Sequence, residues 1–350
     1  MNFASDNTAG IAPQILEAIG RANTGYALGY GNDDWTKRVE KRFAEVFERE
    51  VAVFLVPTGT VANSLALAHM TPPWGAVLCH ADSHVATDEC GAPEFFGGGI
   101  KLVGLKGEGA KISAETLRAA LEGGQWGGPH HVSASVLSLS QASECGTIYR
   151  VDEIGALAEI ARKYKLAVHI DGARLGNALA RMNVSPAEAT WKAGVDVLSF
   201  GATKGGAMGA EAVIFFDPKR GADMLSRRKR GGALASKHRF IAAQMEAYLE
   251  GDLWLTLARH ANAVADVLSE GLTAAGCKPV WPVEANEVFA PLPAALDKKL
   301  KAAGASYYPW QSESLPDGIS IPPDQTLVRL VTSFQTKKED VEKFLAVVRS

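Results

Sequence analysis

The stretch VDEIGALAEIARKYKLAVHID (151–171) contains a helical pattern and a strand pattern in immediate succession. Acidic residues fall in the first turn of the helical part and basic residues in its last turn, an order that favours the dipole of a helix. The run LAVHID that follows is short, apolar and β-rich, which is typical of a buried strand. A helix that leads directly into a buried strand is the repeating unit of α/β proteins, so this stretch sets the expected fold class.

The same alternation extends along the chain in both directions. Short apolar runs recur between longer amphipathic segments, at VAVFLV (51–56), AVLCH (76–80), KLVGL (101–105), SVLSLS (135–140), DVLSFGA (196–202) and EAVIFFD (211–217). We therefore expect an α/β protein with a mostly parallel mixed sheet covered by helices.

The character of the chain changes after Phe216. A basic stretch and a long helical pattern follow, then two strand-like runs at 283–292 and 327–334 and a closing amphipathic helix. We predict a large domain over residues 1–250, which includes the N-terminal segment, and a smaller α+β domain over residues 251–350.

Composition and charge argue against several classes of partner. The 350 residues are 47% hydrophobic and carry a net charge of −3, so no basic field attracts nucleic acid or anionic lipid. Four scattered cysteines without CxxC pairing argue against a disulfide scaffold or a zinc site. No apolar run approaches the ~18 residues of a membrane span, and the N-terminus lacks a secretion signal. We expect a cytoplasmic enzyme that acts on a small molecule.

Two predicted strand ends carry residues that indicate chemistry. HIDGAR (169–174) places Asp171 at the carboxyl end of a buried strand, where open α/β sheets bind ligands. A protonated pyridine nitrogen would satisfy this buried carboxylate; a turn or a salt bridge to Arg174 is the alternative. Lys204 lies between two strands among small, uncharged residues, where an amine is suited to imine formation with an aldehyde cofactor. A solvated loop lysine is the alternative for Lys204 taken alone.

Three further features agree with a cofactor of this kind. VPTGTVANSLAL (56–67) ends a strand and starts a helix, so the free N–H groups at Gly59 and Thr60 form an anion site suited to a phosphate. His84 is either a ring that stacks on a pyridine or an ordinary core or surface histidine; because its stretch lacks ligand spacing, we assign no metal. Arg329 sits inside an apolar strand, where a substrate carboxylate or an interdomain salt bridge would satisfy its guanidinium.

Together these motifs resemble the threonine aldolase family of pyridoxal-5′-phosphate (PLP) enzymes, which have the type I fold of PLP-dependent transferases. The resemblance covers nearly the whole chain and rests on FASDN (3–7), YALGYGNDD (26–34), PTGTVANSLAL (57–67), SHVATDECGAPEFF (83–96), GEGAKIS (107–113), HIDGARLGNA (169–178), SFGATKGG (199–206) and VRLVTSF (328–334). It implies retro-aldol cleavage of L-β-hydroxy-α-amino acids, such as L-threonine, L-allo-threonine and phenylserine, to glycine and an aldehyde. Another PLP reaction, such as β-elimination or transamination, or a non-catalytic ligand-binding role, is the alternative.

The resemblance also implies which residues hold the cofactor. Lys204 would form the Schiff base with PLP, and Asp171 would bind the nitrogen of its ring. Gly59 and Thr60 would bind the phosphate, and His84 would stack on the ring.

A second set of residues is implied for the substrate and for assembly. Arg174 would contact the substrate carboxylate or the hydroxyl side of the PLP ring, and Ser5 and Arg329 would complete the carboxylate site. Family members assemble as dimers of dimers with active sites at an interface. The resemblance therefore implies a homo-oligomer in which Tyr30 and a base from the stretch 227–239, with Lys237 as the candidate, reach the cofactor of a neighbouring subunit.

One position departs from the family pattern. Where many members carry a histidine after the fourth strand, this chain reads SQASECGTIY (140–149), which puts Glu144 at that position. Because the histidine is associated with the β-hydroxyl group of the substrate, the base is open: Glu144, His84 or a water that relays the proton. The departure resembles the branch of the family that accepts phenylserine-type substrates.

Overall fold

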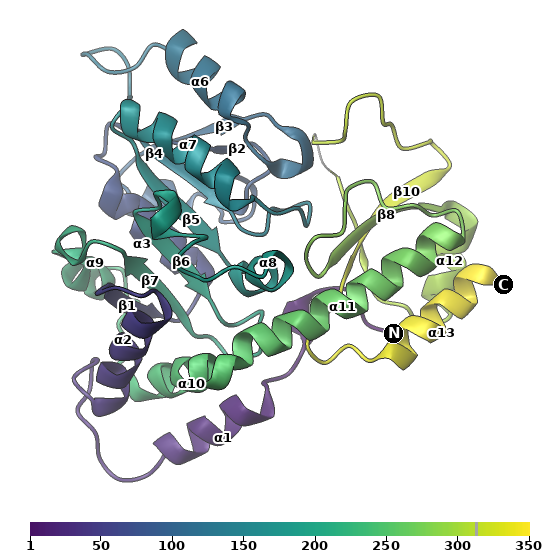
Figure 1. The fold of residues 1–350 in the computed structure, drawn as a ribbon, viewed down its shortest axis with the longest axis horizontal. Helices are drawn as coiled ribbons and strands as arrows, with labels where there is room; N and C mark the ends of the chain where they lie inside the picture. The colour runs from purple at the N-terminus through teal and green to yellow at the C-terminus, as the bar shows by residue number, and fades with distance from the viewer. Residues whose placement is uncertain (312–313) are drawn as a thin grey trace.

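A computed structural model describes residues 1–311 and 314–350 (Figure 1). In these ranges a seven-stranded sheet has the order β1-β7-β6-β5-β4-β2-β3. In that order its strands are β1 (Ala52–Val56), β7 (Glu211–Phe215), β6 (Val197–Gly201), β5 (Ala167–Gly172), β4 (Ser133–Ser140), β2 (Gly75–His80) and β3 (Lys101–Leu105). Only β7 runs antiparallel to its neighbours within this described sheet. The predicted mostly parallel mixed sheet is confirmed.

Helices cover both faces of this sheet and extend beyond it (Figure 1). The described α-helices are α1 (Pro13–Ala22), α2 (Asp34–Val46), α3 (Gly59–Met70), α4 (His84–Thr87), α5 (Ala92–Phe96), α6 (Ala114–Gly123), α7 (Val151–Lys163), α8 (Leu175–Met182), α9 (Met224–Arg230), α10 (Arg239–Leu249), α11 (Leu253–Ala274), α12 (Ala294–Ala302) and α13 (Lys338–Arg349). None of the helices in these parts of the chain combines the length and apolar character that a bilayer span requires.

Alternation along β1 divides the core between the two faces of the sheet. Phe54 and Val56 pack in a cluster with residues of α3 and α9, whereas Val53 and Leu55 belong to the larger core on the other face. Successive side chains of a strand point to opposite faces, so one strand contributes to both layers. Residues 53–56 of the apolar run are therefore buried on both faces, although β1 lies at the edge of the sheet.

His169 ties three central strands together just before the predicted site. One of its ring nitrogens, Nδ1, lies 2.9 Å from Oγ of Ser138 on β4, and the other, Nε2, lies 2.9 Å from Oγ of Ser199 on β6. Burial lowers the pKa of His169 to about 4, so the ring is neutral. This contact fixes the lateral position of β5 two residues before Asp171.

A second sheet forms the smaller part of the molecule. Its order in the described residues is β8-β10-β9, all antiparallel, with β8 (Glu287–Pro293), β10 (Gln325–Val331) and β9 (Tyr308–Pro309). The two predicted strand-like runs of the tail thus correspond to β8 and β10 of this sheet. Helix α11 spans both parts, because Trp254 packs in the large core and Leu268 in the small one.

The N-terminal segment joins the small sheet's core. Asn2 forms a parallel bridge with Ser306, and the ring of Phe3 packs edge-on against Phe344 with centroids 5.2 Å apart. The N-terminal segment accordingly lies beside α13, the C-terminal helix (Figure 1). The proposed division of the chain at residue 250 stays a prediction, with these first residues packed against the smaller part.

Replacing Phe200 with alanine tests the junction between the sheet and its helices. Phe200 is 1% exposed and contacts Phe43 of α2 and Trp254 of α11, with ring centroids 5.2 and 5.3 Å away. We expect Phe200→Ala to lower the free energy of unfolding by about 3–5 kcal/mol, because a large cavity remains in the core. Phe95→Ala is the matched control: Phe95 is 81% exposed, so the effect should stay within about 0.5 kcal/mol. Equal urea midpoints for the two variants would contradict this view of the core.

Candidate active site

The ends of the parallel strands converge on one cavity. Five of these strands reach the same edge of the sheet, and a candidate residue lies at or just after each end: Gly59 and Thr60 after β1, His84 after β2, Glu144 after β4, Asp171 in β5 and Lys204 after β6. All of them line a cavity of about 500 Å³, together with Ser5, Arg174 and Arg329. Open α/β sheets bind ligands at this edge because loops and helix N-termini gather there.

Asp171 is buried at the centre of this edge. Its Oδ2 accepts a hydrogen bond of 2.8 Å from Nδ2 of Asn63, and its Oδ1 accepts one of 3.0 Å from the backbone N–H of Ala173. The second contact is the turn that the sequence left open as an alternative. Each carboxylate oxygen keeps acceptor capacity, so Asp171 is available to a further donor from the cavity.

His84 is held beside Asp171 by a buried carboxyl group. Its Nδ1 lies 2.9 Å from Oε1 of Glu89, and Nδ2 of Asn63 donates to the same oxygen at 2.8 Å. The contact with Glu89 raises the pKa of His84, and burial raises the pKa of Glu89. Ligand atoms of His84, Glu89 and Asp171 lie within 4.8 Å of one another, and the bridging amide of Asn63 accounts for this approach. Sequence reasoning missed Asn63 and Glu89, although Glu89 follows His84 by only five residues.

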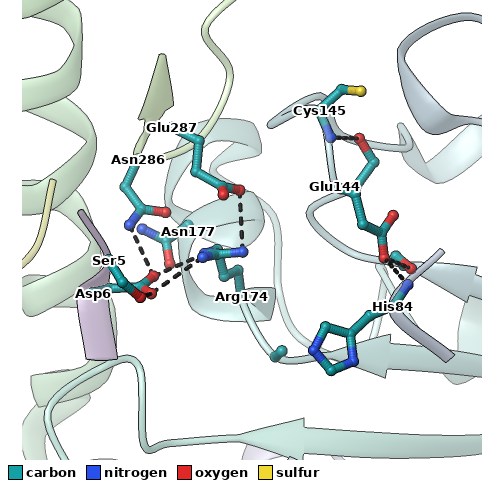
Figure 2. Close-up of polar contacts among 12 residues, drawn as sticks. Ser5, Asp6, His84, Glu144, Cys145, Arg174, Asn177, Asn286 and Glu287 are labelled. Carbon is teal, nitrogen blue, oxygen red and sulfur yellow. Dashed lines mark hydrogen bonds and ion pairs between the residues drawn. The ribbon is translucent and has the colours of Figure 1, made fainter. Parts of the chain in front are cut away.

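Glu144 lies next to His84 at the opposite wall from Arg174 (Figure 2). Its Oε1 accepts hydrogen bonds from the backbone N–H of His84 at 2.8 Å and from Oγ of Ser140 at 2.7 Å. Its Oε2 has no hydrogen-bond partner among residues 1–311 and 314–350. Burial raises the pKa of Glu144 to about 7, so this carboxyl group exchanges its proton near neutral pH.

Lys204 follows β6 and faces the cavity from a half-buried position. Within the described ranges its Nζ forms neither a hydrogen bond nor an ion pair, so the amine is free to react. Glu211 of β7 positions the loop, because its carboxyl group accepts hydrogen bonds from the backbone N–H groups of Ala202 at 3.2 Å and Thr203 at 3.4 Å. Burial raises the pKa of Glu211 to about 7. A Cβ atom at Gly205 would lie 2.0 Å from the hydroxyl of Tyr248. This position of the SFGATKGG segment (199–206) therefore has no room for a side chain.

Arg174 is surrounded by carboxyl groups at the other end of the cavity (Figure 2). Its Nε and Nη2 donate to Oδ2 and Oδ1 of Asp6 at 2.8 and 3.1 Å, and its Nη1 lies 3.1 Å from Oε2 of Glu287. Nδ2 of Asn286 also donates to Oδ2 of Asp6. Burial alone would raise the pKa of Asp6, but the charge of Arg174 holds it below its usual value. Ser5 caps the short helix η1 (Asp6–Thr8) by accepting a hydrogen bond from the backbone N–H of Asn7.

Arg329 enters the same end of the cavity from β10. Its guanidinium lies over the ring of Trp310, 4.8 Å from the centroid. Its Nε has no hydrogen-bond partner, and it takes part in no ion pair, among the residues that the structure describes. The interdomain salt bridge considered from the sequence is thus not formed there, and the guanidinium remains available to an anion.

Tyr30 and Lys237 lie apart from this cavity. Both are exposed on the molecular surface, and the backbone N–H of Tyr30 donates to the carbonyl oxygen of Ser236 at 3.0 Å. The ring of Tyr30 lies 4.8 Å from Nζ of Lys229. Two adjacent surface segments therefore carry these residues, and their contact with a neighbouring subunit stays a prediction.

Known proteins share both the sequence and the fold. The model of the beta-eliminating lyase family matches residues 2–295. A low-specificity L-threonine aldolase of Pseudomonas aeruginosa is 43% identical over 312 residues, which cover 89% of this chain and 90% of that protein. A threonine aldolase structure from Leishmania major is 27% identical with a TM-score of 0.91, and the match covers 99% of this chain and 98% of that one.

A structure with lower sequence identity shows which fold class the chain has. A structure of SPT with its PLP internal aldimine is 17% identical with a TM-score of 0.73, and the match covers 100% of this chain and 86% of that one. The expected type I fold of PLP-dependent transferases is confirmed. The chain belongs to the beta-eliminating lyase family and groups with the low-specificity L-threonine aldolases within it.

Proposed function

We propose that this protein is a PLP-dependent aldolase that cleaves L-β-hydroxy-α-amino acids to glycine and an aldehyde. One observation carries the proposal: the free amine of Lys204, the carboxylate of Asp171 and the guanidinium of Arg329 line one cavity. The identity of 43% to a low-specificity L-threonine aldolase supports the same activity. L-Threonine, L-allo-threonine and phenylserine-type amino acids are the proposed substrates.

The cavity fits the parts of PLP. The N–H groups of Gly59 and Thr60 lie in the first turn of α3, where helices have no internal acceptors, and a Cβ at Gly59 would meet no atom within 4 Å. A phosphate would therefore approach this turn freely. Asp171 would accept a hydrogen bond from the ring nitrogen, and His84 would lie against the ring. Lys204 would bond to the aldehyde carbon.

The residues of the chain determine which bond breaks. Bound PLP supplies an electron sink for the pair of electrons released from the bond between Cα and Cβ. The carboxylate of Asp171 would accept a hydrogen bond from the ring nitrogen and would favour its protonated form. Arg174 and Arg329, with Ser5 nearby, would hold the substrate carboxylate and so fix the orientation of the Cα–Cβ bond.

Glu144 is the proposed base for the β-hydroxyl proton. Its Oε2 is the oxygen without a hydrogen-bond partner in the described ranges, and its pKa of about 7 suits proton transfer at neutral pH. His84 is less suited, because its Nδ1 is engaged by Glu89 and its raised pKa favours the protonated ring. In this assignment His84 orients the cofactor while Glu144 accepts the proton.

We propose further that two copies of the chain complete each other's sites. The loop that carries Tyr30 exposes two more apolar side chains, Tyr26 and Leu28. The backbone of Tyr30 is hydrogen-bonded to that of Ser236, next to Lys237. An exposed apolar loop beside a basic side chain suits a contact with a second subunit. Lys237 would then approach the phosphate of the partner's cofactor.

The substrate panel and a lysine variant test the reaction. The holoenzyme should release glycine and aldehyde from L-threonine, L-allo-threonine and phenylserine, and borohydride reduction should leave a pyridoxyl label on the peptide that contains Lys204. Lys204→Ala should lose the label and on the order of 10³-fold or more of the cleavage rate. The exposed Lys219→Ala should keep both. Release of ammonia or a keto acid, or a label elsewhere, would refute the proposed reaction.

Replacing Glu144 with glutamine tests the base. The ionised form of Glu144 accumulates as pH rises through about 7, so the wild-type kcat should rise across that range. Glu144→Gln should lower kcat by about 10²-fold and remove this rising limb. The exposed Glu108→Gln is the matched control and should keep the wild-type profile. A rising limb that persists in Glu144→Gln would assign the base elsewhere.

Mixed dimers test the shared site. We expect Lys204→Ala and Lys237→Ala each to be nearly inactive alone, because each damages every site of a homodimer. When the two variants are co-expressed in equal amounts, half of the dimers are mixed and each has one intact site, so activity should recover to about one quarter of wild type. Activity of the mixture equal to the mean of the separate variants would show that Lys237 does not act across an interface.

A further inference from the structure

The two carboxyl groups around Arg174 are held very differently. Asp6 accepts two hydrogen bonds from the guanidinium and a third from Asn286. Glu287 lies 3.1 Å from Nη1 of Arg174, yet neither of its carboxyl oxygens accepts a hydrogen bond from any described residue. Asp6 is therefore a permanent partner of Arg174, whereas Glu287 is held by charge alone.

Glu287 is also buried among several charges. Its side chain is 1% exposed, and the groups that act on it are Arg174 at the start of α8, Arg329 on β10, Asp6 on η1 and Lys204 after β6. In the small sheet Glu287 pairs with Val331 and Phe289 pairs with Arg329, so Glu287 and Arg329 are diagonal neighbours on one face. Burial raises the pKa of Glu287, and the positive charges oppose this rise.

We propose that Glu287 is an internal counter-ion that gives up its charge when the substrate carboxylate binds, by taking up one proton from solvent. The inference rests on the proposed function, because it places the carboxylate of an amino acid between Arg174 and Arg329. Glu287 is a positioning residue in this scheme: it acts on the substrate through the arginines.

The balance of charge at this end of the cavity requires such a response. The proposed function commits the amine of Lys204 to the cofactor, which leaves two guanidinium groups facing two carboxylates, those of Asp6 and Glu287, before substrate binds. A third carboxylate would leave an excess of negative charge in a buried space, and like charges at short range raise the pKa of the most weakly held carboxyl group. Glu287 lacks hydrogen bonds to its ionised form, so it is the group that takes up the proton.

Binding of the carboxylate then depends on pH. Where Glu287 is already protonated, binding needs no proton; where it is ionised, each higher pH unit weakens binding by up to about tenfold, by linkage. The pKa of Glu287 is raised above that of an ordinary carboxyl group, so the loss of affinity begins as pH rises through this raised value.

Calorimetry of glycine binding to the holoenzyme measures the proton directly. Titrations in buffers with different enthalpies of ionisation give the number of protons taken up, and the pH is varied from about 6 to 9. Proton changes from the amine of glycine are the same in every variant. Wild type should take up as much as one proton more than Glu287→Gln. The Kd of the variant should depend less on pH. At high pH the variant should therefore bind glycine more tightly than wild type.

Glu284→Gln is the matched control. Glu284 precedes Glu287 by three residues but pairs with Arg150 outside the cavity, so this variant should keep the wild-type proton count. Glu287→Met, uncharged and of similar length, serves if Glu287→Gln does not fold. Equal proton counts in wild type and Glu287 variants, or a wild-type Kd without the extra rise at high pH, would overturn the role of Glu287 while threonine cleavage still stood. Failure of both glycine binding and cleavage would refute the proposed function itself.

Discussion

A carboxylate buried at the end of a central strand must find hydrogen-bond donors, and the arrangement around Asp171 follows from that requirement. Asn63 supplies one donor from inside α3, which fixes this helix over the end of β5 and so places the turn at Gly59. The same amide reaches Glu89, which orients His84. The need of this one buried acid for donors thus links the positions of the helix start, the imidazole and the strand end.

Much of this fold was predictable from the sequence. Parallel strands that are buried on both faces appear as unbroken runs of apolar residues, and such runs can be recognised without a structure. Lys204, Asp171 and Arg329 were predictable for a related reason: a charged or reactive side chain at the end of, or within, an apolar run is costly without a partner. Glu287 meets the same criterion in VEANEVFAPL and was overlooked. The pairing of Arg174 with Asp6 was beyond reach, since the two lie 168 positions apart and only the folded chain brings them together.

The electrostatics of the cavity divide it into two ends with different tasks. At the end beside His84, burial raises the pKa of Glu144 to about 7, so a proton exchanges there near neutral pH. At the other end Arg174 and Arg329 retain positive charge opposite Asp6. A ligand with an anionic group at one end and a transferable proton at the other matches this division, and amino acids with a β-hydroxyl group have that form.

The first residues of the chain connect the two parts of the molecule mechanically. Phe3 packs against Phe344 in the core of the small sheet. Three positions later, Asp6 accepts hydrogen bonds from Arg174 at the cavity. Three residues span at most about 10 Å, so this segment has little slack. Any rotation of the small sheet would pull on Asp6, and the arginine at the carboxylate site would move with it. Any change in the orientation of the small sheet relative to the large one would therefore also change the geometry of the carboxylate site.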